Sequence, residues 1–316
     1  MYSAGIDIGG TLTKLALVRT DGEVLGCETV PTRTATGPHV MLATMRASLE
    51  HLARAAKLAW PPPGGCGIGI PGVIDWNSGG VIFSGPLDWH HIPFGEMAST
   101  ALGCTTVVDT DVNAGALSDL YFGCAPDASD LLYISWGTGI GAGFACGRKL
   151  YHSRGNAMCN FGHMPADPSS DRLCYCGCRG CLEVEAGGKA MVEQAGIRLA
   201  AGERSRLSTA AAALTPEAIA QAAALGDRLA RSILERSAIL MARVLAGLLA
   251  FLNPDTVVFG GGVSQCLPQV RPIFDQELGR RAPSFSLPLT RILRSSFGPQ
   301  AGVVGAAMLP RNRMDP

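Results

Sequence analysis

The stretch AGIDIGGTLTKLALVRTDGEVL, residues 4–25, alternates small, apolar and polar residues on both sides of Gly9-Gly10-Thr11. This pattern is typical of two strands joined by a tight glycine turn, and Asp21-Gly22 would turn the chain into a third strand. The stretch DLLYISWGTGIGAGFACGRKLY, residues 130–151, repeats the order of strand, glycine turn and strand. Two such units predict two similar half-domains.

Helical and strand patterns alternate between these two units. Residues 41–60 have apolar side chains at helical spacing, and Pro61-Pro62-Pro63 would stop that helix. A small-residue strand would end at Pro71-Gly72. Further on, an apolar strand would run into a helix between Asp109 and Asn113.

A long helical pattern covers residues 215–252. Thr215 can cap it and Pro216 can begin it, with a break near Gly226 and an end at Asn253-Pro254. A β-branched strand then breaks into three glycines, and residues 301–310 are typical of a small-residue helix.

The composition excludes several classes of protein. The chain has 316 residues, 47% of them hydrophobic, enough for one large or two ordinary domains, of which we expect two. Basic and acidic residues are equal at 26 each, without runs of like charge, which argues against a nucleic-acid binder. The N-terminus does not resemble a signal peptide, and the most apolar stretch, residues 237–252, contains Arg243 and is too short for a membrane span. We therefore expect a soluble cytoplasmic protein without a membrane partner.

Eleven cysteines are unusual for such a protein. Thiols stay reduced in the cytoplasm, so they argue for free thiols and a metal rather than a disulfide framework. Four of them lie within eight residues of the stretch CYCGCRGCLE, residues 174–183. Disulfides, a metal site and a reactive cluster are the alternatives for this stretch.

The first glycine turn has the residues of a phosphate-binding loop. Its glycines would let the backbone approach a phosphate closely, and the exposed amides and the Thr11 hydroxyl could donate to the phosphate oxygens. Asp7 at the strand end could hold Mg²⁺ through water, with Lys14 nearby. A plain hairpin turn is the alternative, because Gly-Gly-Thr is a short signal.

Two further glycine turns each follow an apolar strand. GTGIGAG, residues 137–143, imitates a dinucleotide fingerprint, but no acidic residue occurs between Gly143 and Asp167, and a strand pattern follows instead of a helix. A second phosphate hairpin therefore fits better. The glycines at 260–262 would let the backbone lie flat against a planar ligand such as a purine, although strand-ending glycines are common.

These motifs together resemble the ROK family (repressors, open reading frames, kinases) of the actin-like and hexokinase-like ATPase superfamily, over nearly the whole chain. DIGGTLTK is similar to the first phosphate loop, IGIPGVID to the sugar loop, and DTDVNAGAL to the catalytic segment. GTGIGAG is similar to the second phosphate loop, CYCGCRGCLE to the zinc segment, and VVFGGGVS to the adenosine loop. Their order and spacing make the resemblance specific.

The resemblance implies an α/β fold with two lobes, the actin-like ATPase (ribonuclease H-like) architecture, and an active site in the cleft between the lobes. Residues 1–115 would form the N-terminal lobe, completed by a C-terminal helix at about 298–316. Residues 116–297 would form the C-terminal lobe, with the zinc site and the adenosine loop.

It also implies the residues of the site. ATP and Mg²⁺ would be bound by Asp7, Gly9, Gly10, Thr11, Lys14, Gly137, Thr138, Gly139, Gly141, Gly260, Gly261 and Gly262. The substrate would contact Gly72, Thr110, Asp111, Asn160, His163 and Glu183.

For the cysteine stretch the family pattern is Gly-His followed by Cys-x-Cys-Gly-x-x-Gly-Cys-Leu-Glu. It implies a structural Zn²⁺ bound by His163, Cys174, Cys176 and Cys181, which completes the tetrahedron that zinc favours. Cys178 falls on a variable position and would be a spare thiol, although ligand exchange with it is conceivable. The metal would fix the backbone so that His163 and Glu183 face the substrate.

Asp111 aligns with the family's catalytic aspartate. Phosphoryl transfer to an alcohol needs a carboxylate that accepts the hydroxyl proton while Mg²⁺ and amides neutralise the phosphates. Asp109 lies two residues away on the same strand face, but the motif offset places it outside that role. Asp111 as a helix cap is the structural alternative, and it is compatible with catalysis.

Two positions depart from the pattern of glucose-type members. Thr110 replaces the Asn before the aspartate, and Asn160 replaces the Glu of Glu-x-Gly-His. The second change removes a charge and an acceptor, and one charge-assisted hydrogen bond is worth about 1.5 to 3 kcal/mol. The assignments of glucose and of N-acetylhexosamines as substrate are therefore weakened, and a cyclitol, a modified sugar or a ketose becomes a serious candidate.

The predicted function is an ATP-dependent kinase of a small sugar or sugar-like polyol in carbohydrate metabolism, with Asp111 as the general base. A DNA-binding repressor is disfavoured, because the phosphate loop begins at Asp7 and leaves no room for a helix-turn-helix before it. A sugar-binding relative with weak or no turnover is the main alternative, favoured by Asn160. The donor could also be polyphosphate, and the family habit implies a homodimer.

Overall fold

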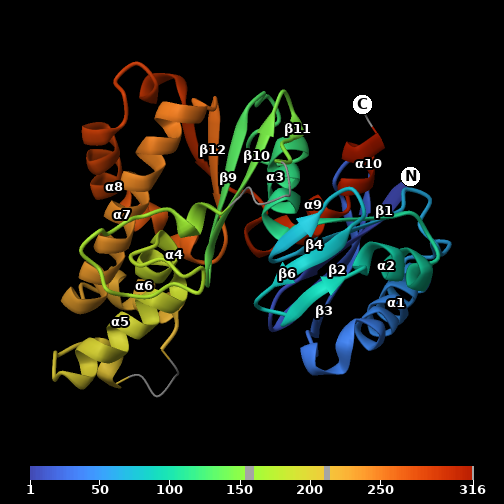
Figure 1. Ribbon diagram of the computed structural model, residues 1–316, viewed down its shortest axis with the longest axis horizontal. Helices are drawn as coiled ribbons and strands as arrows, with labels where there is room; N and C mark the ends of the chain where they lie inside the picture. Colours follow the sequence, from blue (N-terminus) through green and yellow to red (C-terminus); the bar gives the residue numbers. More distant parts are fainter. Residues whose placement is uncertain (154–159, 210–213, 315–316) are drawn as a thin grey trace. The chain divides into compact units, whose positions relative to one another are not determined.

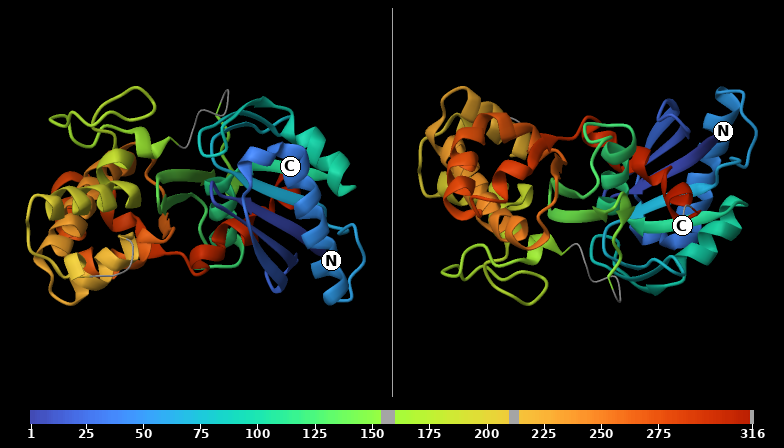
Figure 2. Two further views of the ribbon diagram at one scale, coloured as in Figure 1. Left: turned by 90° about the horizontal axis from the view of Figure 1, so that it is seen from below. Right: turned by 90° about the horizontal axis from the view of Figure 1, so that it is seen from above.

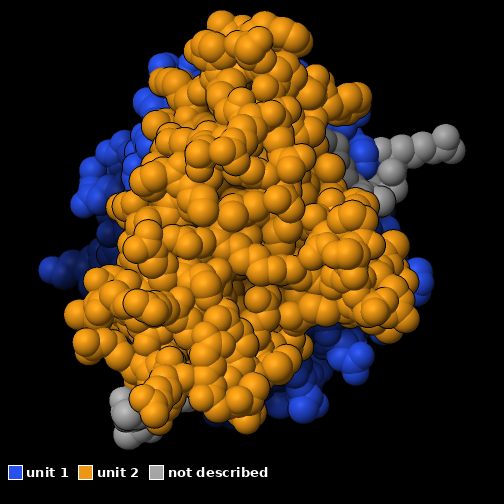
Figure 3. Space-filling model, turned by 90° about the vertical axis from the view of Figure 1, so that its left-hand side faces the viewer, with its two compact units in different colours: residues 1–133, 143–159, 295–316 blue, residues 134–142, 160–294 orange. Residues whose placement is uncertain are grey.

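The structure is a computed structural model that describes residues 1–153, 160–209 and 214–314. It divides into two compact units. The first unit comprises Met1–Tyr133, Gly143–Cys159 and Ser295–Pro316, and the second comprises Ile134–Ala142 and Asn160–Arg294. Figure 3 shows the two units in different colours.

The first unit is built on a mixed five-stranded sheet with the order β3-β2-β1-β4-β8. β1, β2 and β3 form the predicted antiparallel meander, and β4 and β8 add parallel strands beside β1. The strands are β1 (Tyr2–Ile8), β2 (Leu12–Arg19), β3 (Val24–Pro31), β4 (Cys66–Ile70) and β8 (Thr106–Thr110).

Helices cover both faces of this sheet (Figure 1). One face packs against α1 (Gly37–Ala55) and α2 (Phe94–Leu102), and the other against α3 (Asp111–Tyr121) and α9 (Ala301–Ala306). Alternation along the strands explains this arrangement, because successive side chains point to opposite faces. Leu15 and Leu17 belong to the core under α1, whereas Ala16 belongs to the core under α9.

Glycines let α9 lie close to the sheet. A Cβ at Gly5 would stand 2.1 Å from the Val303 carbonyl oxygen, and one at Gly67 would stand 1.7 Å from the Ala306 carbonyl oxygen. Asp7 follows Gly5 by two residues and therefore points toward the same face. The small residues predicted for 301–310 are thus matched by small residues on the strands.

The first helix differs from the prediction at both ends. It spans Gly37–Ala55 instead of residues 41–60, with Pro38 in its first turn, a position that proline favours. Lys57 has a left-handed backbone with φ of 57°, so the chain leaves the helix before the three prolines.

The remaining parts of the first unit are small. A three-stranded antiparallel sheet contains β5 (Val73–Asp75), β6 (Gly80–Ser84) and β7 (Trp89–Ile92). The helix α10 (Leu309–Met314) follows α9.

A second five-stranded sheet has the order β11-β10-β9-β12-β13, and the division between the units passes through β9 and β10. It confirms the second predicted strand, glycine turn and strand. The strands are β9 (Leu131–Trp136), β10 (Ile140–Cys146), β11 (Lys149–Leu150), β12 (Thr256–Gly260) and β13 (Arg291–Arg294).

The second unit is mainly helical. α7 (Arg228–Leu252) packs against all the other helices of this unit, which gather around it in both views of Figure 2. These are α4 (Leu182–Ala186), α5 (Gly188–Ala200), α6 (Pro216–Ala224) and α8 (Leu267–Arg281). Short 3₁₀ turns of this unit lie at Phe161–His163, Arg206–Thr209, Val263–Cys266 and Leu287–Leu289, and those of the first unit lie at Thr34–Thr36 and Gly298–Gln300.

The signals at the helix ends of this unit are confirmed. Thr215 accepts a hydrogen bond from the Ala218 N–H at 3.1 Å, and the predicted break separates α6 from α7. Asn253 ends α7 with a left-handed backbone, which satisfies the last carbonyl groups. Among the described residues, no helix has both the length and the apolar character needed to cross a membrane.

The compact units differ from the expected lobes in two segments. Among the described residues, 116–133 and 143–153 belong to the first unit, not to the second. The physical reason for the first segment is that α3 packs on α9, where Gly305 allows close contact: a Cβ there would stand 1.6 Å from the Ala114 carbonyl oxygen. The helix that begins at Asp111 is therefore a structural part of the first unit.

Candidate active site

The predicted site residues fall into two groups, one in each unit. The first unit holds the first glycine turn, Gly72 and the β8–α3 junction. The second unit holds the other two glycine turns and the cysteine stretch with the residues around it.

Asp7 and Lys14 face each other across β1 and β2. They are direct partners in the antiparallel register, and the Lys14 Nζ lies 3.6 Å from the Asp7 Oδ2. Lys14 also donates to the Pro299 carbonyl oxygen at 2.5 Å. Burial raises the pKa of the Asp7 carboxyl, and the charge of Lys14 opposes that rise. Gly302 on α9 leaves room for this carboxylate, because a Cβ there would stand 2.6 Å from it.

The turn between β1 and β2 presents exposed backbone. The Gly9 N–H donates to the Leu12 carbonyl oxygen at 3.0 Å and closes the turn, while Gly10 and Thr11 are exposed. This turn directly follows the strand that carries Asp7. Backbone donors beside a carboxylate and an ammonium group can bind a phosphate together with its cation.

Asp111 is the first residue of α3. Its Oδ1 accepts the Val112 N–H at 2.9 Å, and the side chain is partly exposed. Burial and the negative charge of Asp7 raise the pKa of the Asp111 carboxyl to about 7, whereas the N–H groups of Val112 and Asp111 lower it. A carboxylate with a pKa near the working pH is suited to accept and release a proton.

Thr110, not Asp111, caps this helix. Its Oγ1 accepts the Asn113 N–H at 3.3 Å, and the residue is 6% exposed. The alternative interpretation of Asp111 as the helix cap is therefore wrong, because Thr110 is the cap. The Thr110 hydroxyl, predicted to contact substrate, is already engaged within the helix end.

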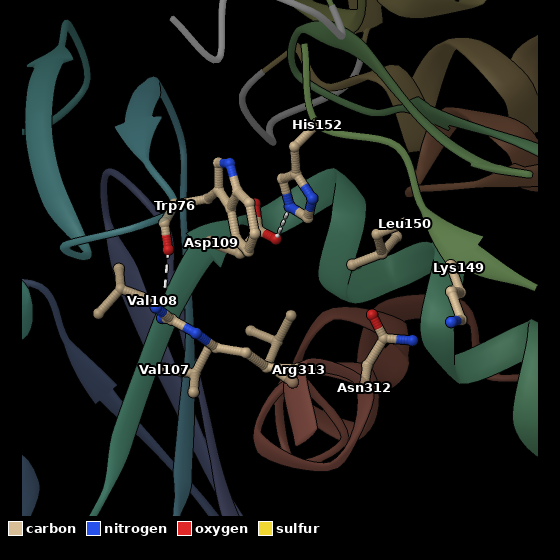
Figure 4. Close-up of a pocket in the computed structure, with 10 residues that line it drawn as sticks. Trp76, Val107, Val108, Asp109, Lys149, Leu150, His152, Asn312 and Arg313 are labelled. Carbon is tan, nitrogen blue, oxygen red and sulfur yellow. Dashed lines mark hydrogen bonds and ion pairs between the residues drawn. The ribbon is translucent and has the colours of Figure 1, made fainter. Parts of the chain in front are cut away.

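Asp109 is buried, and both of its carboxylate oxygens form hydrogen bonds with neighbouring groups. Its Oδ1 accepts the Thr110 N–H at 2.7 Å and the Asn113 Nδ2–H at 2.9 Å, and its Oδ2 lies 2.6 Å from the His152 Nε2 (Figure 4). The sequence did not reveal His152 as a site residue, because it lies 43 positions away from Asp109. No motif spacing connects the two.

Gly72 lies at the predicted sugar loop with φ of 133°. A Cβ there would stand 2.2 Å from the Phe83 carbonyl oxygen, so only glycine fits. This explains the glycine structurally, independently of a ligand.

In the second unit the turn between β9 and β10 is held by backbone bonds. The Gly188 N–H donates to the Gly137 carbonyl oxygen at 2.9 Å, and the Lys189 N–H donates to the Thr138 carbonyl oxygen at 3.0 Å. The Glu183 Oε2 accepts the Ile140 N–H at 2.9 Å. Glu183, predicted to face the substrate, thus supports the glycine turn with at least one carboxylate oxygen.

The third glycine turn lies against the second. Gly261 has φ of 82°, and a Cβ there would stand 2.5 Å from the Trp136 carbonyl oxygen. Gly262 is exposed beside it. The two turns predicted to bind a nucleotide are therefore neighbours in the second unit.

The cysteine stretch brings four metal-ligating side chains together. The ligand atoms of His163, Cys174, Cys176 and Cys181 all lie within 4.8 Å of one another. The Cys176 and Cys181 sulfurs are 3.7 Å apart, and the Cys174 sulfur lies 3.3 Å from the His163 Nδ1. A tetrahedral zinc with Zn–S bonds of about 2.3 Å requires sulfurs about 3.8 Å apart, so the residues fit this metal. Cys178 is exposed and lies outside the cluster.

His163 uses its two ring nitrogens differently. Nδ1 faces the sulfurs, while Nε2 lies 2.8 Å from the Tyr175 hydroxyl. Asn160, the other predicted substrate contact, is exposed, and its carbonyl oxygen accepts the His163 N–H at 2.9 Å. Tyr175 was not singled out from the sequence, because it occupies a variable position between two cysteines.

Comparison with known proteins gives a consistent result. The family model described as "ROK family" matches residues 3–313. The glucokinase of Thermotoga maritima is 28% identical over 98% of this chain and 97% of its own length.

Two solved structures are similar over nearly the whole chain. A ROK family glucokinase from Streptomyces griseus in complex with glucose and AMPPNP is 30% identical, with a TM-score of 0.83 over 98% of this chain and 99% of that one. A ROK family transcriptional regulator, a homolog of the Escherichia coli Mlc protein, is 26% identical, with a TM-score of 0.85 over 98% of this chain and 78% of that one. The two-lobed actin-like ATPase architecture is thereby confirmed, and this chain belongs to the ROK family.

Proposed function

We propose that the protein is an ATP-dependent kinase that transfers the γ-phosphoryl group to a hydroxyl of a sugar or sugar-like polyol. One observation carries the proposal: the β8–α3 junction presents a partly exposed Asp111 whose carboxyl pKa is raised to about 7 beside Asp7. The glucokinase relatives support the same reaction class.

In this proposal Asp111 accepts the proton of the acceptor hydroxyl as the oxygen attacks the phosphorus. Asp7 and Lys14 lie beside the turn of Gly9, Gly10 and Thr11. The N–H groups of the exposed residues Gly10 and Thr11 would donate to phosphate oxygens. When bound, Mg²⁺ would neutralise phosphate charge, and Asp7 is the residue that would hold it through water. The glycine turns at 137–141 and 260–262 would bind the rest of the nucleotide.

Zinc is part of the proposal. His163, Cys174, Cys176 and Cys181 would bind it as a structural metal, because all four positions of the tetrahedron come from the protein. It would hold the segment that carries His163 and the start of α4. A homodimer stays a prediction from the family resemblance, and sedimentation velocity tests it. A cytoplasmic location stays a prediction from the sequence itself.

The acceptor class follows from Asn160. An amide replaces the carboxylate that glucose-type members carry, which weakens the case for glucose and strengthens it for cyclitols, modified sugars or ketoses. A sugar-binding protein with little turnover is the second candidate that Asn160 favours, and the likeness to a regulator agrees with it.

The test is an ADP-release assay with MgATP and a panel of hexoses, N-acetylhexosamines, ketoses, inositols and other cyclitols. The wild type is compared with Asp111→Asn and with the matched control Asp275→Asn, an exposed carboxylate on α8. Turnover on one class that is lost only in Asp111→Asn supports the kinase. Binding of a sugar by calorimetry without turnover on any acceptor supports the second candidate.

A further inference from the structure

The pair formed by Asp109 and His152 is not explained by the proposed reaction. Their side chains are only 6% and 14% exposed, and the Nε2–Oδ2 distance is 2.6 Å. Because a carboxylate only accepts, the His152 Nε2 carries the hydrogen and donates it. A histidine that comes just after β11 is therefore bound to the strand that leads into α3.

An aromatic stack holds the His152 ring in place. The rings of Trp76 and His152 are stacked with centroids 4.6 Å apart and an angle of 17° between planes. The Arg313 Cζ lies 5.6 Å from the Trp76 ring centroid, and its guanidinium donates to the Trp76 carbonyl oxygen at 3.2 Å. Trp76, His152 and Arg313 line one cavity of about 210 Å³, which Asp109 also lines. Figure 4 shows these side chains.

The second oxygen of Asp109 acts on the helix end. By accepting the Thr110 N–H and the Asn113 Nδ2–H, the Oδ1 ties the last residue of β8 to the first turn of α3. Asp111 and Val112 are the residues between Thr110 and Asn113. The position of its carboxylate thus depends on a turn that Asp109 holds from one side and the Thr110 cap from the other.

We propose that His152, through Asp109, is a positioning residue for Asp111. The inference rests on the proposed function of Asp111 as the general base. Asp109 itself does not act on substrate, because it is 4% exposed and both of its oxygens accept hydrogen bonds. His152 fixes the carboxylate, the carboxylate fixes the first turn of α3, and that turn places the base.

The pair is tested with His152→Leu and His152→Gln. The leucine variant cannot donate to Asp109, whereas the glutamine variant keeps an N–H near the position of Nε2. We expect His152→Leu to lower kcat by about 10- to 100-fold, the usual effect of a misplaced catalytic group, with the KM for ATP unchanged within about twofold. His152→Gln should retain most of the rate. His51→Leu, an exposed histidine on α1, is the matched control.

A double variant separates positioning from general destabilisation. If His152 acts only through Asp109, Asp109→Asn combined with His152→Leu loses no more rate than Asp109→Asn alone. Additive losses overturn the proposal. A His152→Leu enzyme with the same kcat as the control also overturns it, and so does an equal loss of kcat in the His152→Gln and His152→Leu variants.

Amide hydrogen exchange provides a readout that does not need turnover. The N–H groups at the start of α3 should exchange faster in His152→Leu than in the wild type, and at the wild-type rate in His152→Gln. Equal exchange rates in the wild type and both variants overturn the proposal. If the leucine variant does not fold, His152→Asn replaces it, because the shorter amide cannot reach Asp109. A wild type that is inactive on every acceptor would instead refute the proposed function, while the exchange comparison still decides the positioning role.

Discussion

The β8–α3 junction of the first unit and the glycine turns of the second unit use their polar groups in opposite ways. At the junction, partly exposed Asp111 has a carboxyl pKa raised to about 7 by burial and by the charge of Asp7. In the second unit, Glu183 accepts a backbone N–H, and the turn at 137–139 is fastened by two further backbone bonds.

The polar groups of the junction are therefore suited to proton transfer, whereas those of the second unit are suited to hold the backbone rigid. A carboxyl group kept close to another negative charge is costly to the fold but useful for proton transfer. Satisfied backbone bonds, and a metal bound by His163, Cys174, Cys176 and Cys181 as proposed, would stabilise a shape without providing a reactive group. Substitutions at the junction should therefore change rate before stability, and substitutions in the second unit should change stability before rate.

The largest expected effect is on the rate of Asp111→Asn. Loss of the general base should lower kcat by about 10²- to 10⁴-fold. In the wild type, kcat/KM should rise with pH and level off above about 7, since Asp111 works deprotonated and its carboxyl pKa is raised to about 7. An acid limb that persists unchanged in Asp111→Asn would assign that titration to another group.

The same substitution should stabilise the fold at high pH. The carboxyl pKa is about 7 in the folded protein against an ordinary value of 3.8, so the folded state holds its proton more tightly. Stability from this group is complete below about pH 4 and is lost as pH rises through 7. The Tm of Asp111→Asn should therefore exceed that of the wild type at pH 8, and the two should converge near pH 4. If the wild type is as stable as Asp111→Asn at pH 8, or more stable, the contrast between the two regions is contradicted.

Zinc removal should act on stability. We expect Cys176→Ser to lose the bound metal and to lower Tm by about 5–10 °C, corresponding to about 2–3 kcal/mol. Cys178→Ser is the matched control, because Cys178 lies nearby but outside the cluster. Metal content by atomic emission and Tm are measured together, and equal zinc in the two variants would refute the assignment of the ligands.

Alanine substitution of one glycine in each unit, Gly10 and Gly261, compares the two glycine turns directly. Gly261→Ala forces a Cβ to within 2.5 Å of the Trp136 carbonyl oxygen at a positive φ, and should destabilise the protein by about 1–3 kcal/mol. Gly10→Ala meets only Pro86, whose Cβ would lie 3.1 Å and whose carbonyl oxygen 3.5 Å from the new Cβ, and should leave Tm nearly unchanged while weakening MgATP binding. Thermal unfolding and calorimetry distinguish the two, and a reversed order of the Tm changes would break the comparison.

The predictions from sequence succeeded where the signal was local. Thr215 sits immediately before a helix and caps it, and the meander around Gly9 follows from alternation and a glycine turn. The first helix was misplaced because proline can begin a helix as well as follow it, and Pro38 lies in its first turn. The expected lobe boundary after residue 115 missed the packing of α3 on α9, which joins segments far apart in the chain.

For the site, the family resemblance implied a set of residues, and the contacts of these residues are read from the structure. The family resemblance implied His163, Cys174, Cys176 and Cys181 as zinc ligands, and the structure brings these four side chains together. His152 was missed because its partner is 43 positions away, and the cap formed by Thr110 depends on backbone angles at one residue. Long-range pairing and the choice between two neighbouring side chains require the folded chain.

The smallest expected effect concerns Tyr175. Its hydroxyl lies 2.8 Å from the His163 Nε2, and the residue is 69% exposed, so a substrate hydroxyl that binds this nitrogen would have to displace it. Tyr175→Phe removes the competing group and keeps the ring that packs edge-on against His163. Because an exposed hydrogen bond is worth about 0.5–1 kcal/mol, we expect the acceptor to bind about two- to fivefold more tightly, without a change in Tm or zinc content. Calorimetric titration of the acceptor identified in the panel measures this, with Tyr151→Phe, an exposed tyrosine of the first unit, as the control. Weaker binding in Tyr175→Phe would mean that the hydroxyl contacts the substrate itself, and Tyr175 would then join Asn160 as a determinant of acceptor choice.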